Sequence, residues 1–214
     1  GETVYYEIVG FTDSGAPIMG DGNNEKVGKD FVKQYGKTTT FSYGCSHDGW
    51  GNAVYKTDEW GNSVVERKEV PISDVYVYRM TMTNEEGFVV EYTPDFMRYR
   101  CEQMGVKTVP VFARFIIPYN EAELGLYHDH CEVPIDAGEW VIMKAEQFYA
   151  GPDPIGKTHT REGVVVRILN KPKFCAYKHK NWYFKALEGI VKVEAEAPDM
   201  EEADGLEEEI VDSN

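Results

Sequence analysis

The apolar residues of this chain fall into short β-prone runs closed by turn residues, and this pattern constrains its fold most. Residues 4–9 and 74–83 are rich in Val, Ile and Tyr, which favour strands. The second run ends in Asn84-Glu85-Glu86-Gly87, which turns the chain back on itself. Further strands are predicted at residues 38–43, 88–92, 109–117, 162–169 and 174–180, with a hairpin or exposed loop at 47–62.

Three segments carry helix signals. Thr93 is a good N-cap with Pro94 at the first helical position, and Gly105 is placed to end the helix predicted over 95–104. Asn181 can cap a final helix that runs to about residue 193, and another helix is expected at 139–149. Together with the strands, these signals predict an α+β fold of antiparallel sheets with packed helices.

The charge of the chain is distributed unevenly. The formal net charge is −15, and residues 194–214 contain ten Asp or Glu and no Lys or Arg. Such a run repels itself and buries little, so we predict a disordered acidic tail at 194–214 behind a domain of residues 1–193. The alternative is an autoinhibitory tail that mimics nucleic acid. The rest of the chain is not basic enough to predict a nucleic-acid partner from bulk charge.

Composition excludes several classes of protein. Hydrophobic residues make up 42% of the chain, enough for a core, and no apolar run approaches the roughly 18–20 residues that a membrane span needs. The start of the sequence resembles no signal peptide, and the four cysteines form no C-x-x-C, so we expect a reducing, cytoplasmic compartment. His128-Asp129-His130-Cys131 could bind zinc, although no second pair of ligands completes a tetrahedral site.

Two carboxylates within β-prone runs are candidate ligand-binding groups. Glu7 is centred in an apolar strand, where the hydroxyls of a ribose would be suitable partners; alternatively, the strand lies at an edge with Glu7 in water. Glu162 precedes Gly163 and a run of valines. Its carboxylate could hold a hard cation such as Mg²⁺, or it could be an exposed charge at a strand end. Gly163 permits close approach of another backbone.

Two further pairs of side chains share a strand face by alternation. Lys178 and Lys180 lie on one face with His179 on the other. Neighbouring cations repel, so this pair suits a polyanion such as triphosphate, unless both are ordinary surface lysines. Tyr76 and Tyr78 also share a face, where one could stack on a purine or both could pack across the sheet.

The order of these segments resembles the later motifs of the covalent nucleotidyltransferases, which are the ATP-dependent RNA and DNA ligases and the mRNA capping enzymes. The continuation from residue 181 to 189 looks most like the RNA ligases, in particular the Deinococcus-type nick-sealing branch, and the resemblance covers most of residues 3–192. The segments that carry it are Tyr6-Glu7-Ile8-Val9-Gly10, Tyr76-Val77-Tyr78-Arg79-Met80, Glu162-Gly163-Val164-Val165-Val166-Arg167, Tyr177-Lys178-His179-Lys180 and Asn181-Trp182-Tyr183-Phe184-Lys185-Ala186-Leu187-Glu188-Gly189.

The resemblance implies a nucleotidyltransferase (ATP-grasp-like) ligase domain that binds ATP. Glu7 would bind the ribose, and Tyr78, or Tyr76 beside it, would stack on adenine. The implied reaction joins a 5′-phosphate to a 3′-hydroxyl in RNA, at a nicked duplex or at RNA ends, in a bacterial or phage-infected cell. A DNA ligase, a capping enzyme, and a module that binds nucleotide or nucleic acid without catalysis remain the alternatives.

The same resemblance assigns the phosphate and metal contacts. Glu162 would act in metal-assisted nucleotidyl transfer with Mg²⁺ or Mn²⁺, and Lys178 and Lys180 would contact the phosphates of ATP. Arg167 would be a further phosphate contact.

The family's nucleophile is a lysine in a K-x-D-G motif that precedes the Glu7 segment, where it forms a lysyl-AMP intermediate. The 214 residues contain no K-x-D-G; Lys56-Thr57-Asp58-Glu59 has the wrong fourth residue and follows Glu7. We therefore expect the chain to be the C-terminal part of an adenylyltransferase domain, incomplete at its N-terminus and unable to adenylylate itself. A missing N-terminal segment or a separate chain would supply the lysine.

Overall fold

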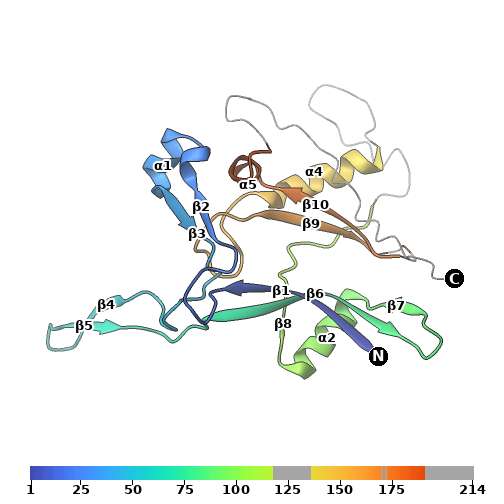
Figure 1. Ribbon diagram of the computed structural model, residues 1–214, viewed down its shortest axis with the longest axis horizontal. Coiled ribbons are helices and arrows are strands. Elements are labelled where there is room, and N and C mark those ends of the chain that lie inside the picture. Colours follow the sequence, from blue (N-terminus) through green and yellow to red (C-terminus); the bar gives the residue numbers. More distant parts are fainter. Residues whose placement is uncertain (118–135, 170, 172, 191–214) are drawn as a thin grey trace.

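The computed structural model describes residues 1–117, 136–169, 171 and 173–190 (Figure 1). Over these residues the chain has an α+β fold with several small, mostly antiparallel sheets and four α-helices, so the predicted fold class is confirmed at that level. The elements are β1 (Glu2–Gly10), β2 (Asp21–Asn23), η1 (Asn24–Lys26), α1 (Lys29–Tyr35), β3 (Thr38–Thr40), β4 (Val54–Thr57), β5 (Ser63–Glu66), β6 (Ser73–Thr83), β7 (Val89–Glu91), α2 (Pro94–Met104), β8 (Lys107–Thr108), α4 (Ala137–Tyr149), β9 (Gly163–Ile168), β10 (Cys175–Lys180) and α5 (Trp182–Leu187).

The largest sheet has the order β1-β6-β7, with β8 parallel to β6 and the other pairs antiparallel. Helix α2 covers one face of this sheet (Figure 1) and buries Met97 and Cys101 against Val77 and Met80. The helix begins and ends as predicted. The Thr93 side chain accepts a hydrogen bond from the N–H of Phe96, and Gly105 closes the helix in the left-handed region at φ 68°.

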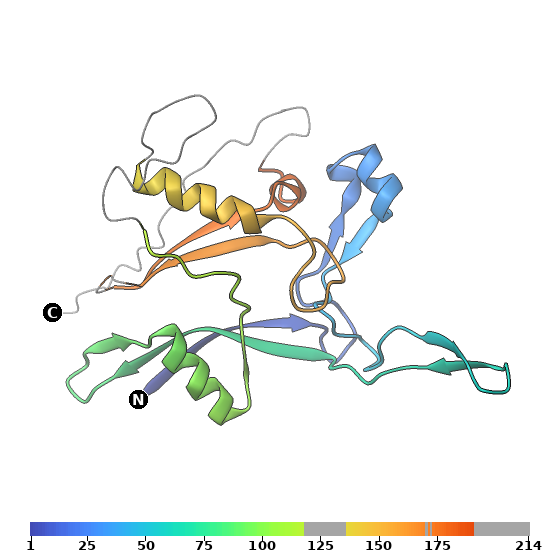
Figure 2. The same cartoon turned by 180° about the vertical axis from the view of Figure 1, so that it is seen from behind.

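A second antiparallel layer, β9 with β10, lies over the other face of the β1-β6 sheet, and α4 covers its outer side (Figures 1 and 2). Arg79 of β6 pairs with Glu91 at 2.6 Å, and Arg167 of β9 donates to the carbonyl of Tyr92 at 3.2 Å. The ring of Phe174 lies 4.4 Å from the Arg79 guanidinium and 5.2 Å from that of Arg167. This cluster joins the two layers through partly buried charge and cation–π contact.

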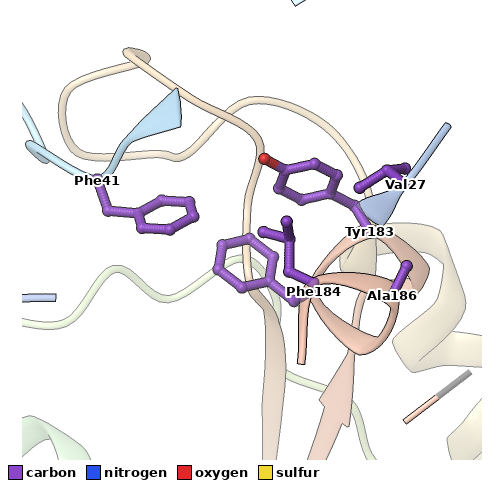
Figure 3. Packing of buried hydrophobic residues seen from close by; sticks show 6 residues of the cluster. Val27, Phe41, Tyr183, Phe184 and Ala186 are labelled. Carbon is purple, nitrogen blue, oxygen red and sulfur yellow. The ribbon is translucent and has the colours of Figure 1, made fainter. Parts of the chain in front are cut away.

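Helix α5 packs against the segment that contains β2, η1, α1 and β3. The Tyr183 hydroxyl donates to Oδ1 of the buried Asn24 at 2.6 Å, and Asn24 Nδ2 donates to the carbonyl of Gly36 at 3.0 Å. These bonds satisfy polar groups that would otherwise be costly to bury. Figure 3 shows the apolar residues of the same contact, whose buried members are Val27, Phe41, Tyr183, Phe184, Ala186 and Leu187.

Some predicted elements are absent or displaced. The strand predicted at 109–117 is wrong: pairing with β6 ends at Thr108, because Pro110 has no N–H to continue a ladder. The hairpin predicted at 47–62 forms later, as β4 and β5. The last helix ends at Leu187, and Gly189 follows at φ 76°. Residues 128–131 and the acidic tail lie outside the described residues.

No helix among the residues that the structure describes is long and apolar enough to cross a membrane.

A buried carboxylate organises the loop that leads from α4 into β9. Asp153 is 1% exposed, and its oxygens accept hydrogen bonds from the N–H groups of Ile155, Gly156 and Thr158 at 2.8–2.9 Å. The loop shaped in this way lies against Gly44: a Cβ on Gly156 would be 2.1 Å from the Gly44 nitrogen. A side chain at Gly156 would therefore push apart two segments that are distant in sequence.

Replacing the buried Asp153 by alanine leaves three partly buried backbone N–H groups without their acceptor. We expect D153A to lower the free energy of unfolding by about 3 kcal/mol, measured by urea denaturation. Asp58→Ala is the matched control, because Asp58 accepts the N–H groups of Trp60 and Asn62 in an exposed turn. Water replaces those bonds, so the expected loss there is much smaller than for D153A. Equal losses in the two variants would contradict this account of the loop.

Glu2 ties β1 to α2 and to Tyr92, the residue that follows β7. Its carboxylate accepts from the Arg100 guanidinium at 2.6–2.8 Å and from the Tyr92 hydroxyl at 2.7 Å. These hydrogen bonds, the one from Arg100 foremost, lower the pKa of Glu2 to about 2.

A carboxylate with a lowered pKa in the folded state stabilises the fold above its ordinary pKa of 4.5, and this stabilisation is lost as the pH falls towards 2. We expect Glu2→Gln to lower the melting temperature at pH 6, and the gap from the wild type to close between pH 4.5 and pH 2. Glu86→Gln, in the exposed turn after β6, is the control and should show no gap. A gap for E2Q that is constant over this pH range would be evidence against the linkage.

Candidate functional site

Glu162 is fixed at the end of the β9–β10 hairpin. Gly163 pairs with Lys180, and a Cβ on Gly163 would lie 2.1 Å from the carbonyl oxygen of His179. The close backbone approach predicted for this glycine is therefore present. The Asn181 N–H also donates to the Glu162 carbonyl at 2.7 Å. These contacts hold the Glu162 side chain beside the end of β10.

The two predicted lysines lie next to this carboxylate. Lys178 Nζ is 2.6 Å from Glu162 Oε1, and Lys180 Nζ is 3.9 Å from the same atom. Lys180 also pairs with Glu188 at 2.5 Å. On the opposite face of β10, the His179 ring contacts Tyr149 of α4 at 5.0 Å, as alternation predicts. Two ammonium groups and two carboxylates thus meet at one end of the hairpin.

Glu7 lies on β1 of the β1-β6 sheet. Its side chain is exposed on β1, an edge strand within the described part of the chain. These surroundings match the alternative in which Glu7 lies in water at a sheet edge. Glu7 pairs with Tyr76, and directly paired residues share a face. Tyr76 is buried in a cluster against which Tyr43 and Ile155 pack. The carboxylate therefore lies on the sheet face that is turned towards the Asp153 loop.

Tyr43, which the sequence did not single out, packs against the cluster that contains Tyr76, and its ring meets that of His159 at 4.4 Å. Burial raises the pKa of its phenol, and the charges of Glu162, Asp153 and Glu7 raise that pKa further. Tyr43 follows a β-prone run and has φ 50°, an uncommon value for a residue with a side chain. The sequence feature that marks this position is the neighbouring Gly44. Glycine is common in turns of every kind, so it does not single out Tyr43.

The two predicted stacking tyrosines have different surroundings. Tyr5 pairs with Arg79 and Tyr6 with Val77, so Tyr78 is an extra residue at a bulge in β6. The bulge interrupts the regular alternation on which the prediction of a shared face for Tyr76 and Tyr78 depends. The Tyr78 ring lies 6.4 Å from that of Tyr5. Tyr76 is 8% exposed, whereas Tyr78 is 37% exposed. Of the two rings, that of Tyr78 is the accessible one.

Arg167 lies farther along β9, among the contacts that join the two layers. Its guanidinium is 3.4 Å from a Glu91 oxygen and donates to Tyr92. Burial lowers its pKa, with the Glu91 charge acting in the opposite direction. The structure gives Arg167 these protein partners, and a phosphate contact for it stays a prediction.

The described residues contain no group of three or more His, Cys, Asp or Glu side chains able to hold a metal ion. Glu162 alone offers a carboxylate beside two lysines. Mg²⁺ is commonly held by one or two carboxylates, several waters and substrate phosphates. Glu162 supplies one such carboxylate, so a Mg²⁺ ion here would take its remaining ligands from water and substrate.

Comparison of the chain with known protein families, with curated proteins and with solved structures gives no match.

The Lys178–Glu162 pair should contribute little to folding, because half of the lysine side chain is exposed. We expect a double-mutant cycle of K178A and E162Q to give a coupling below about 1 kcal/mol in urea denaturation. The matched cycle is R79A with E91Q, whose side chains are 14% and 21% exposed, and its coupling should be clearly larger. A larger coupling at Lys178–Glu162 would instead assign that pair to the scaffold.

Proposed function

We propose that this chain is the nucleotide-binding part of an ATP-dependent RNA ligase. Such an enzyme joins a 5′-phosphate to a 3′-hydroxyl through enzyme-AMP and RNA-adenylate intermediates. One observation carries the proposal: Glu162 lies 2.6 Å from Lys178 and 3.9 Å from Lys180. The order of the sequence segments that hold these residues supports the same conclusion.

In this proposal, the lysines hold the phosphates of ATP. Lys178 and Lys180 share the Glu162 carboxylate, and a phosphate oxygen can take its place at either ammonium. Phosphoryl-type transfer depends mainly on positioning and on neutralising charge. Bound Mg²⁺ or Mn²⁺ would supply further charge neutralisation beside Glu162. The lysines orient the phosphates, and Glu162 balances the lysines when no nucleotide is bound.

The remaining contacts concern the nucleoside. The exposed Glu7 carboxylate would accept hydrogen bonds from the ribose hydroxyls, and the accessible ring of Tyr78 would stack on adenine. No K-x-D-G lysine occurs in the 214 residues, so the nucleophile in this proposal comes from another segment or chain. A module that binds nucleotide without reacting is the second candidate, and this same observation favours it.

We expect the chain to bind ATP with Mg²⁺ in isothermal titration calorimetry, and K178A/K180A to bind at least about 10-fold more weakly. The variant loses two charge-assisted hydrogen bonds to phosphate, each worth roughly 1.5–3 kcal/mol. Adenosine has no phosphates, so its affinity should be the same for the variant and the wild type. The intact mass should not increase by one AMP during incubation with ATP and Mg²⁺.

The matched control is Lys173→Ala, which removes an exposed lysine before β10, at the far end of the hairpin from Glu162. Its ATP affinity should equal that of the wild type. A wild-type chain that binds no ATP, or a K173A variant weakened as much as K178A/K180A, would overturn the proposed role of the lysines.

A further inference from the structure

The charged cluster at the end of the β9–β10 hairpin has a formal charge of zero. Lys178 and Lys180 bring the positive charges, and Glu162 and Glu188 bring the negative ones. A polyanion that approaches this cluster is attracted by the lysines and repelled by the carboxylates. Both ammonium groups become available to one ligand only after a carboxylate has moved away.

The two carboxylates are held differently. The Glu162 carbonyl accepts the Asn181 N–H at 2.7 Å, and the Glu162 side chain is 26% exposed. Its Oε1 is 2.6 Å from Lys178 Nζ but 3.9 Å from Lys180 Nζ. Glu188 is the C-cap of α5, and both of its carboxylate oxygens lie 2.5 Å from Lys180 Nζ. With its side chain 42% exposed, Glu188 is both the nearer partner of Lys180 and the more exposed carboxylate.

The Glu188 side chain can leave Lys180 while α5 stays folded. The helix is anchored by Tyr183, Phe184, Ala186 and Leu187, which are all buried in one apolar cluster. The Glu188 N–H donates to the carbonyl of Phe184 at 3.0 Å, and this backbone bond does not involve the carboxylate. Separating a partly exposed ion pair costs little, so a stronger anion can take the place of Glu188.

Resting on the proposed function, we propose that Glu188 is an internal competitor for Lys180. Its carboxylate occupies the Lys180 ammonium when the site is empty, and the triphosphate of ATP displaces it. A phosphate oxygen can replace a carboxylate oxygen at an ammonium group, whereas a nucleoside without phosphates has no group that can do so. Glu188 therefore restricts the site to ligands that carry a polyphosphate.

The test is Glu188→Gln in the full chain, titrated by calorimetry with ATP and Mg²⁺, with inorganic tripolyphosphate and with adenosine. Glutamine keeps the shape of the side chain and removes its charge, so phosphate no longer competes with a carboxylate at Lys180. We expect ATP and tripolyphosphate to bind at least about 3-fold more tightly, and adenosine affinity to stay unchanged. A residue that only supported α5 would give weaker or unchanged ATP binding when it was replaced.

The matched control is Glu86→Gln, which removes the same charge from the exposed turn after β6. Its affinities should stay at wild-type values. A gain in E86Q as large as that in E188Q would assign the effect to the net charge of the chain and would overturn the inference.

A second measurement follows the displacement in the wild-type chain. A carbodiimide links a carboxylate to an amine in contact with it, with loss of water, and mass spectrometry locates the linked peptides. We expect the yield of the Lys180–Glu188 link to fall when ATP and Mg²⁺ are present. The Lys56–Glu66 pair of the β4–β5 hairpin is the internal control for reagent consumed by ATP, and its link should not fall as far.

Two results would overturn this inference alone: an ATP affinity of E188Q that is equal to or below that of the wild type, or a Lys180–Glu188 link that ATP reduces no more than the control link. A wild-type chain that binds no ATP would overturn the proposed function and this inference together.

Discussion

The Asp153 carboxylate is the interaction on which the candidate site depends. Its three N–H partners shape the loop between α4 and β9, and this shape brings Gly156 against Gly44. Tyr43 is held beside that contact, and Glu162 enters β9 from the same loop. The buried Asp153 carboxylate therefore helps to position the segments that carry Tyr43 and Glu162. The backbone hydrogen bonds from Asp153 N–H to His159 and from Arg161 N–H to Gly151 close the same loop.

Burial divides the ion pairs of this chain into two kinds. Arg79, Glu91 and Arg167 are between 14% and 21% exposed, and with Phe174 they connect the two layers. Lys178 and Glu162 are 50% and 26% exposed. Water weakens the attraction between them, so their ion pair contributes little to the stability of the fold. An exposed ion pair such as Lys178–Glu162 separates at small energetic cost, so its lysine can exchange the carboxylate for a ligand. The first kind belongs to the scaffold.

The parts of the fold that could be predicted are those with local causes. The Thr93 cap, Pro94 and Gly105 define α2, and alternation places Lys178 and Lys180 together in β10. β3 lies within the strand predicted at 38–43, whereas β2 and α1 were not predicted, because the order of that segment comes from contact with α5. Asp153 and Tyr43 carry no sequence signal of their own, since their positions result from tertiary contacts. The bulge at Tyr78 likewise depends on how β1 pairs with β6.

The most direct test of the central claim is a crystal structure of the full chain with Mg²⁺ and a non-hydrolysable ATP analogue. The account predicts the triphosphate within hydrogen-bonding distance of the Lys178 and Lys180 ammonium groups. It also predicts the ribose at Glu7 and the adenine on the ring of Tyr78. A nucleotide bound elsewhere on the chain, with the Lys178–Glu162 pair unchanged at 2.6 Å, would contradict the claim.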